Sequence, residues 1–232
     1  MAQVIQASEL TLHDVEEKFH LQQVEDEHFF GEWQGKLPEL TAAQKEWLDQ
    51  VKADFLALEK YPVHEEIVKM VVLSPLLSLA GLFRYPFRPV AEKQVEIMVE
   101  EKDEVVRGRI DVLVLHQQLW VTVIESKSKR FSLSEALPQA LFYMLNSPNL
   151  LQPTFGLVTN GSHFTFIKLM RQDMPQYGLS DEFTLRRRGN ELYQVLGVLK
   201  RLQKELIESV IRSYLAIGNR SYTKNGAPTR TD

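Results

Sequence analysis

The hydrophobic pattern of the chain is helical over about 42–81 and becomes strand-like at about residue 95, with two further helices later in the chain. Apolar residues recur at helical spacing over 42–60, and Thr41 with Gln44 forms a capping box ahead of the first turn. A second helix is expected from about residue 63, with a kink or restart at Ser74-Pro75 and an end at Gly81. This part of the chain is therefore predicted to be mainly helical.

Residues 95–101 alternate apolar and polar positions, as half-buried strands do, and further strands are expected after them. A helix is expected after the third strand, and Pro138 is expected to delay its first regular turn to about Leu137. An Asn-Gly pair predicts a turn between the fourth and fifth strands. The strands are expected at 95–101, 105–115, 119–127, 155–161 and 164–171, the helices at 132–146 and 190–216.

The order of helix, three strands, helix, two strands and helix predicts a mixed α/β fold, in which helices flank a central mixed sheet. We expect residues 1–60 to form an acidic, helical N-terminal arm. Residues 61–217 are expected to form the main domain, which ends in the C-terminal helix. Residues 218–232 are rich in Arg, Ser, Thr and Asn, so a disordered tail is predicted there.

Composition excludes some chemistries and leaves others open. The 232 residues contain no cysteine, which rules out thiol nucleophiles, disulfides and cysteine-ligated zinc. The N-terminal sequence carries acids where a signal peptide needs basic residues, and no apolar run is long enough for a membrane span, so we expect a soluble, cytoplasmic protein without a membrane partner. The net charge of −4 is uneven: residues 1–60 hold 5 basic and 13 acidic residues. The remainder is mildly basic, which neither favours nor excludes DNA binding.

Three charged residues stand out in the predicted strands. Asp111 lies inside the apolar run IDVLVL, and the next strand ends with Glu125 and Lys127. If the two strands pair as a hairpin around residues 116–118, Asp111 and Glu125 lie near each other, and two carboxylates that close need a cation between them. A solvated ion pair on the strand surface is the alternative explanation of these residues.

This pattern resembles the signature of the PD-(D/E)XK nuclease superfamily, with Ile110-Asp111 in place of Pro-Asp and Glu125-Ser126-Lys127 as the second element. Gln139 and Tyr143 resemble the Gln-x-x-x-Tyr motif of RecB-like nucleases. The same motif occurs in the N-terminal nuclease domain of type I restriction enzyme motor subunits. The resemblance covers about residues 63–170 and implies a restriction-endonuclease-like core.

The segment HEEIVKMVVLSPLL resembles the first helix of that restriction domain, which carries a metal-binding glutamate. Glu65 is the matching residue, with Glu66 as the alternative. The resemblance implies that Glu65, Asp111, Glu125 and the Ser126 carbonyl bind Mg²⁺ or Mn²⁺, and that Asp111, Glu125 and Lys127 are catalytic. Substrate contacts are expected from the two motif residues, Gln139 and Tyr143. They are also expected from two basic residues just beyond the site, Lys129 and Arg130.

The expected function is therefore metal-dependent hydrolysis of DNA, as an endonuclease or exonuclease. The chain has no Gly-Lys-Ser/Thr phosphate loop, so ATP is not an expected partner, and a homodimer stays open. One alternative is a catalytically silent nucleic-acid-binding or assembly module with the same fold. The other is an unrelated α/β binding protein in which these charges are structural.

Overall fold

A computed structural model of the protein describes residues 3–99, 104–116, 119–126, 132–148, 150, 152–171 and 174–222. For residues 3, 97–99, 115–116, 119–126 and 209–222 it describes only the course of the backbone.

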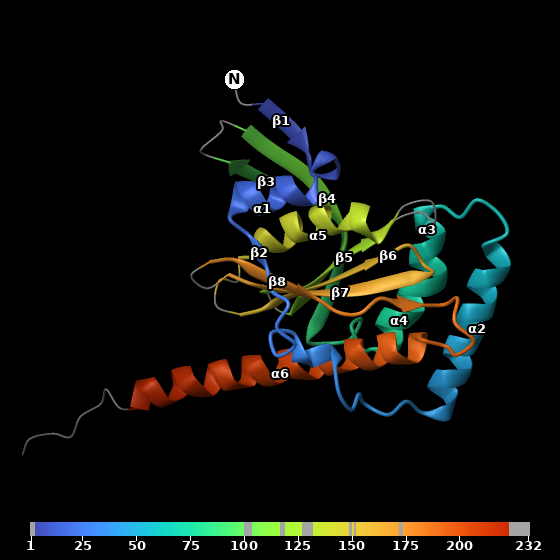
Figure 1. Cartoon of the computed structure of the whole chain (residues 1–232). Coiled ribbons are helices and arrows are strands. Elements are labelled where there is room, and N and C mark those ends of the chain that lie inside the picture. The colour runs from blue at the N-terminus through green and yellow to red at the C-terminus, as the bar shows by residue number, and fades with distance from the viewer. Residues whose placement is uncertain are drawn as a thin grey trace, which may run out of the picture.

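A mixed sheet forms the centre of the molecule (Figure 1). The order of its described strands is β1-β4-β5-β6-β7-β8-β2, with β3 paired to β4 and β9 paired to β7. The pairs β1–β4, β2–β8 and β5–β6 are parallel, and the other pairs are antiparallel. The strands are β1 (Gln3–Gln6), β2 (Gln22–Gln23), β3 (Phe87–Val99), β4 (Glu104–His116), β5 (Leu119–Ser126), β6 (Thr154–Thr159), β7 (His163–Met170), β8 (Gln176–Leu179) and β9 (Phe183–Thr184).

Helices cover both faces of the sheet, so the mixed α/β class predicted from the sequence is confirmed. One face carries α1 and α5, and α2, α3, α4 and α6 lie against the other (Figure 1). The helices are α1 (Leu12–Phe19), α2 (Ala42–Leu58), α3 (Glu65–Val68), α4 (Ser74–Leu79), α5 (Leu133–Leu145) and α6 (Leu192–Tyr222), with the short 3-10 turns η1 (Ala7–Glu9) and η2 (Gly31–Trp33) and the π-helical segment η3 (Lys69–Leu73).

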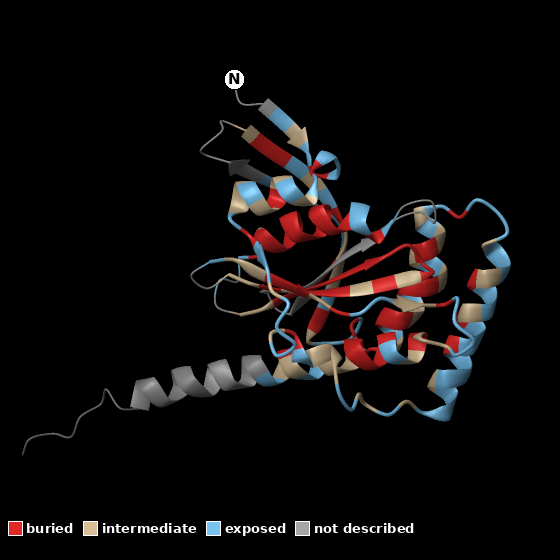
Figure 2. Ribbon diagram, viewed as in Figure 1, coloured by how far each residue is buried: buried red, intermediate tan, exposed pale blue. Residues whose placement is uncertain are grey.

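The core consists of two apolar clusters, one on each face of the sheet. Residues of β6 serve both, since Phe155 and Leu157 point into the first cluster and Val158 into the second. Helix α5 is buried along most of its length (Figure 2), because it lies between the sheet and α1, where Phe142 packs against Phe19 with ring centroids 6.0 Å apart. The strands between the clusters are therefore fixed from both sides.

Local sequence signals explain most element boundaries. The capping box of Thr41 and Gln44 begins α2 as predicted. Pro75 lies where the π-helical segment η3 continues into α4, at the position where the sequence predicts a kink or restart. The delayed start predicted for α5 is wrong: the helix begins at Leu133, with Ser132 as its N-cap, and Pro138 lies inside it. The missing N–H of Pro138 leaves only the carbonyl of Ser134 without its helical partner, and Ser134 is exposed to water.

The N-terminal 60 residues contribute strands as well as helices. The sequence analysis predicted neither β1, which pairs with β4, nor β2, which pairs with β8, and this region also supplies residues to both clusters. At the other end, α6 reaches Tyr222, and residues 223–232 of the predicted tail lie outside the described part. None of the helices described is long and apolar enough to cross a membrane.

Candidate functional site

One edge of β4 is interrupted next to Asp111. Strand β3 pairs with one edge of β4 at every residue except Asp111. The other edge is shared by β1 at residues 104–107 and β5 at residues 112–116. Residues 108–111 therefore have no strand neighbour on that edge in the described register. In this gap the backbone N–H of Arg109 donates instead to the Tyr143 hydroxyl, at 2.9 Å. The candidate site lies at this stretch of β4, between the residues that pair with β1 and those that pair with β5.

The alternation of side chains between the two faces of the sheet is interrupted at Asp111. Ile110 and Leu113 are three residues apart yet both point into the cluster beneath α5, whereas regular alternation would put them on opposite faces. The partner strand is irregular at the same level, since Glu92 has a left-handed φ of 54° and the β3–β4 register omits the Glu92–Asp111 pair. The register is the same on both sides of this point, so the irregularity omits one residue of each strand from the register, Glu92 in β3 and Asp111 in β4. Such irregularities redirect side chains, and this one is centred on Asp111.

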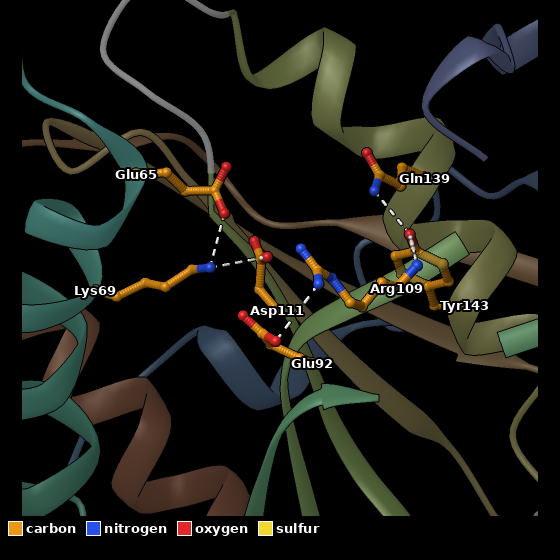
Figure 3. Close-up of polar contacts among 7 residues, drawn as sticks. All are labelled: Glu65, Lys69, Glu92, Arg109, Asp111, Gln139 and Tyr143. Carbon is orange, nitrogen blue, oxygen red and sulfur yellow. Dashed lines mark hydrogen bonds and ion pairs between the residues drawn. The ribbon is translucent and has the colours of Figure 1, made fainter. Parts of the chain in front are cut away.

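Asp111 is joined to the first helix of the predicted site through a lysine (Figure 3). The Lys69 ammonium lies 3.0 Å from Asp111 Oδ1 and 2.7 Å from Glu65 Oε1. The three side chains are partly buried, with exposed fractions of 13% for Asp111, 23% for Lys69 and 32% for Glu65. Burial lowers the pKa of Lys69, but its hydrogen bonds to the two carboxylates raise the pKa by more than burial lowers it. The pKa therefore lies above the ordinary value for lysine. Two carboxylates that are distant in the sequence thus converge on one cation.

The local helix geometry explains this convergence. Glu65 is the first residue of α3, and Lys69 follows one turn later at spacing i,i+4, which brings side chains onto the same helix face. Lys69 is also the first residue of the π-helical segment η3, and π-helical turns occur frequently at functional sites. Glu66 is exposed, so of the two glutamates considered from the sequence it is Glu65 that lies beside Asp111.

The second acidic element lies on the adjacent strand. The β4–β5 pairing runs as a hairpin from His116–Leu119 to Val112–Ile124, and Asp111 and Glu125 are the next residues on the two strands. Only the backbone of Glu125 and Ser126 is described, where they pair with Val158 and Thr159 of β6. Lys127, Lys129 and Arg130 lie outside the described residues. Their predicted roles stay predictions.

Among the side chains that are described, no three His, Asp or Glu residues form a group able to hold a metal ion. The Glu125 side chain is not among them, so the described part of the site comprises Glu65, Lys69 and Asp111.

Compared with known proteins, the chain matches no protein-family model, and no curated protein is significantly similar to it.

Gln139 and Tyr143 lie on one face of α5, as their spacing predicts, but inside the core. Tyr143 is fully buried and Gln139 is 8% exposed, and the Gln139 amide donates to the Tyr143 hydroxyl at 2.7 Å. The tyrosine ring lies directly over Gly108, where an added Cβ would come within 2.6 Å of a ring carbon. Direct contact with substrate stays a prediction for both residues. In the structure they hold the interrupted edge of β4, two residues before Asp111.

Two charged residues beside Asp111 did not emerge from the sequence analysis. Lys69 follows Glu65 at a spacing that is a known signal for a helical ion pair, but its pairing with Asp111 depends on tertiary packing. Arg109 is 62% exposed on β4 and forms an ion pair with Glu92 of β3, with Nη1 and Oε2 3.4 Å apart (Figure 3). The charge of Arg109 is offset by that of Glu92, so this pair adds no net positive charge next to Asp111.

Proposed function

We propose that this protein is a metal-dependent nuclease that hydrolyses phosphodiester bonds in DNA, with a restriction-endonuclease-like core. The observation that carries the proposal is the convergence of Glu65 and Asp111 on one cation beside the strand that ends in Glu125 and Ser126. Two partly buried carboxylates from separate elements lie within 3.0 Å of the same nitrogen, and oxygen ligands gathered in this way suit a hard divalent cation.

The order of the elements supports the same proposal. A helix that carries Glu65 precedes the antiparallel strands β3, β4 and β5, and α5 then connects β5 to the parallel strand β6. Asp111, Glu125 and the Gln139–Tyr143 pair occur on the second strand, the third strand and the following helix. This order is the one that the resemblance to PD-(D/E)XK nucleases implies.

The residues present fit a hard divalent cation. Glu65 and Asp111 already hold a positively charged nitrogen within 3.0 Å, and oxygen ligands of this kind suit Mg²⁺ or Mn²⁺. Glu65, Asp111, Glu125 and the Ser126 carbonyl would hold the ion. When bound, the ion would supply Lewis acidity and a bound water of lowered pKa.

The basic residues have roles in this proposal that the carboxylates cannot fill. Without a cation, the acidic cluster repels the phosphates of DNA, so binding as well as hydrolysis depends on positive charge. Lys127 would orient the attacking water or neutralise charge that develops on the phosphate. Lys129 and Arg130 would contact the phosphate backbone and fix the strand in position.

Cleavage of single-stranded, duplex and branched DNA tests the proposal, with Mg²⁺, Mn²⁺, Ca²⁺ or EDTA. We expect cleavage with Mg²⁺ or Mn²⁺, none with EDTA, and DNA binding with little cleavage in Ca²⁺. Asp111→Ala should lose both metal affinity and turnover. Lys127→Ala should keep the metal and lose most of the turnover, because it removes no ligand. Glu46→Ala, an exposed acid on α2, is the control and should behave like the wild type.

A catalytically silent binding module makes the opposite prediction. Its DNA affinity would not depend on the metal, and Asp111→Ala would leave that affinity unchanged or improve it by removing a negative charge. Binding of this kind, without cleavage of any of the three DNA forms, would refute the nuclease proposal.

A further inference from the structure

Lys69 occupies the place between the carboxylates where the proposed cation would bind. Its ammonium contacts both Glu65 and Asp111, so the two oxygens that it joins are less than about 6 Å apart. Ligand oxygens lie about 2.0–2.1 Å from Mg²⁺, closer than they lie to this nitrogen, and one ion would fill the same gap. A divalent ion bound to these same two oxygens would lie close to the ammonium, so the two cations would repel each other and compete for the carboxylates.

We propose that Lys69 stands in for the divalent cation in the metal-free protein, and that the cation must displace it to bind Glu65 and Asp111. This inference rests on the proposed function, because it presupposes a metal site at these residues. It adds that the affinity of the site for metal is set partly by competition with a residue of the chain itself.

A cation between these carboxylates has an electrostatic role in the fold. Glu65 and Asp111 belong to different elements, a helix and a strand, and each is shielded from water by at least two thirds. Lys69 offsets part of the repulsion between the two carboxylates, which acts between the start of α3 and β4. The lysine therefore joins α3 to the sheet and holds the two carboxylates close together before metal arrives.

The structure also gives the lysine a way to leave. Its side chain is 23% exposed, and a flexible four-carbon stem lets the ammonium turn towards water without movement of the backbone. Its backbone lies in the π-helical segment η3, where the hydrogen-bonding pattern of the helix changes. Displacement then exchanges two charge-assisted hydrogen bonds for metal coordination and for hydration of the ammonium.

Mn²⁺ binding to the full chain, measured by calorimetry and by the paramagnetic resonance of free Mn²⁺, tests this competition. Lys69→Met removes the ammonium and keeps the shape of the stem, and Lys69→Gln serves if the methionine variant folds poorly. Lys93→Met is the matched control. It removes the same charge from the strand beside Asp111, where Lys93 pairs in register with Ile110, and no ion pair joins Lys93 to Glu65 or Asp111 in the described contacts.

We expect Lys69→Met to bind Mn²⁺ about tenfold more tightly than the wild type or better, which is the equivalent of one charge-assisted hydrogen bond. Lys93→Met should differ from the wild type by less than about threefold, since a solvent-exposed charge has only a weak effect at this distance. In EDTA the order of thermal stability should be reversed: Lys69→Met should melt below the wild type and gain more from added Mn²⁺.

Two results would overturn the inference, and they differ from each other. If the wild type binds Mn²⁺ and Lys69→Met binds it equally or more weakly, the competition is refuted while the metal site stands. The same applies if Lys93→Met tightens binding as much as Lys69→Met does. If neither the wild type nor Lys69→Met binds Mn²⁺, or if Asp111→Ala binds it as the wild type does, the proposed metal site fails and the inference fails with it.

Discussion

The Tyr143 hydroxyl takes the place of a missing strand at the edge of β4, and Tyr143→Phe removes that single oxygen. The oxygen accepts hydrogen bonds from the Arg109 backbone N–H at 2.9 Å and from the Gln139 amide at 2.7 Å. The ring remains, so the packing over Gly108 is preserved. The substitution therefore isolates the hydrogen bonds from the burial of apolar surface.

The expected loss of stability follows from the two donors. A buried donor left without its acceptor costs about 1–3 kcal/mol. The Arg109 N–H belongs to the backbone of a strand and cannot turn away, whereas the Gln139 amide can rotate. We therefore expect the free energy of unfolding of Tyr143→Phe to fall by about 2 kcal/mol in equilibrium urea unfolding followed by circular dichroism. If the site is a metal site, Mn²⁺ affinity should fall as well, because the loosened segment ends at Asp111.

Tyr177→Phe is the matched control for this change. Tyr177 is also fully buried, and its hydroxyl donates to Glu16 at 2.9 Å and to Gln23 at 3.2 Å. It lies on β8, which three strands separate from β4 and Asp111. This variant should lose a similar amount of stability and keep its affinity for Mn²⁺. A Tyr143→Phe protein within about 0.5 kcal/mol of the wild type would refute the structural role of the hydroxyl. Equal damage to Mn²⁺ binding by both variants would refute its link to the site.

Two further predictions concern packing and pH. Gly108→Ala should lower the free energy of unfolding by about 1–3 kcal/mol, because the new Cβ would lie 2.5 Å from the Tyr143 hydroxyl and 2.7 Å from the Cβ of Ala7. Gly189→Ala, where nothing lies within 4 Å, should change it little in the same urea titration. Glu205→Gln should stabilise the protein at pH 7, because burial and the nearby Glu32 raise the pKa of Glu205 above its usual 4.5. The advantage should shrink as the pH falls through the raised pKa and should vanish below 4.5, where the wild-type residue becomes protonated in the unfolded state as well. An advantage independent of pH would contradict this explanation.

Elements with strong local signals were predictable from the sequence, and elements that depend on distant partners were not. The capping box at Thr41 predicts the start of α2, and the apolar residues of 105–115 predict β4, whose observed bounds are Glu104–His116. By contrast, β1 and β2 are short and carry no alternation that distinguishes them from a loop. They are strands because β4 and β8 offer free edges to them.

The candidate site shows the same division. Glu65 and Asp111 were predicted together, and they share a contact in the structure through Lys69. Lys69 itself could not be assigned to the site from the sequence, because its ion pair with Asp111 spans 42 residues and depends on how α3 packs against β4. The roles of Glu125, Ser126 and Lys127 stay predictions.

The interrupted edge of β4 connects these observations to the shape of the site. A strand paired continuously through residues 108–111 would keep Asp111 within the ladder, with both edges hydrogen-bonded. The gap between β1 and β5 removes that constraint, but it leaves a backbone donor at Arg109 that must still find a partner. The hydroxyl of Tyr143 supplies the acceptor, and the amide of Gln139, one turn earlier on α5, donates to that hydroxyl and holds it in position. The spacing of Gln139 and Tyr143 is thus explained by the backbone of β4. These two residues can act on the site from the core, by holding the strand that presents Asp111 to Lys69.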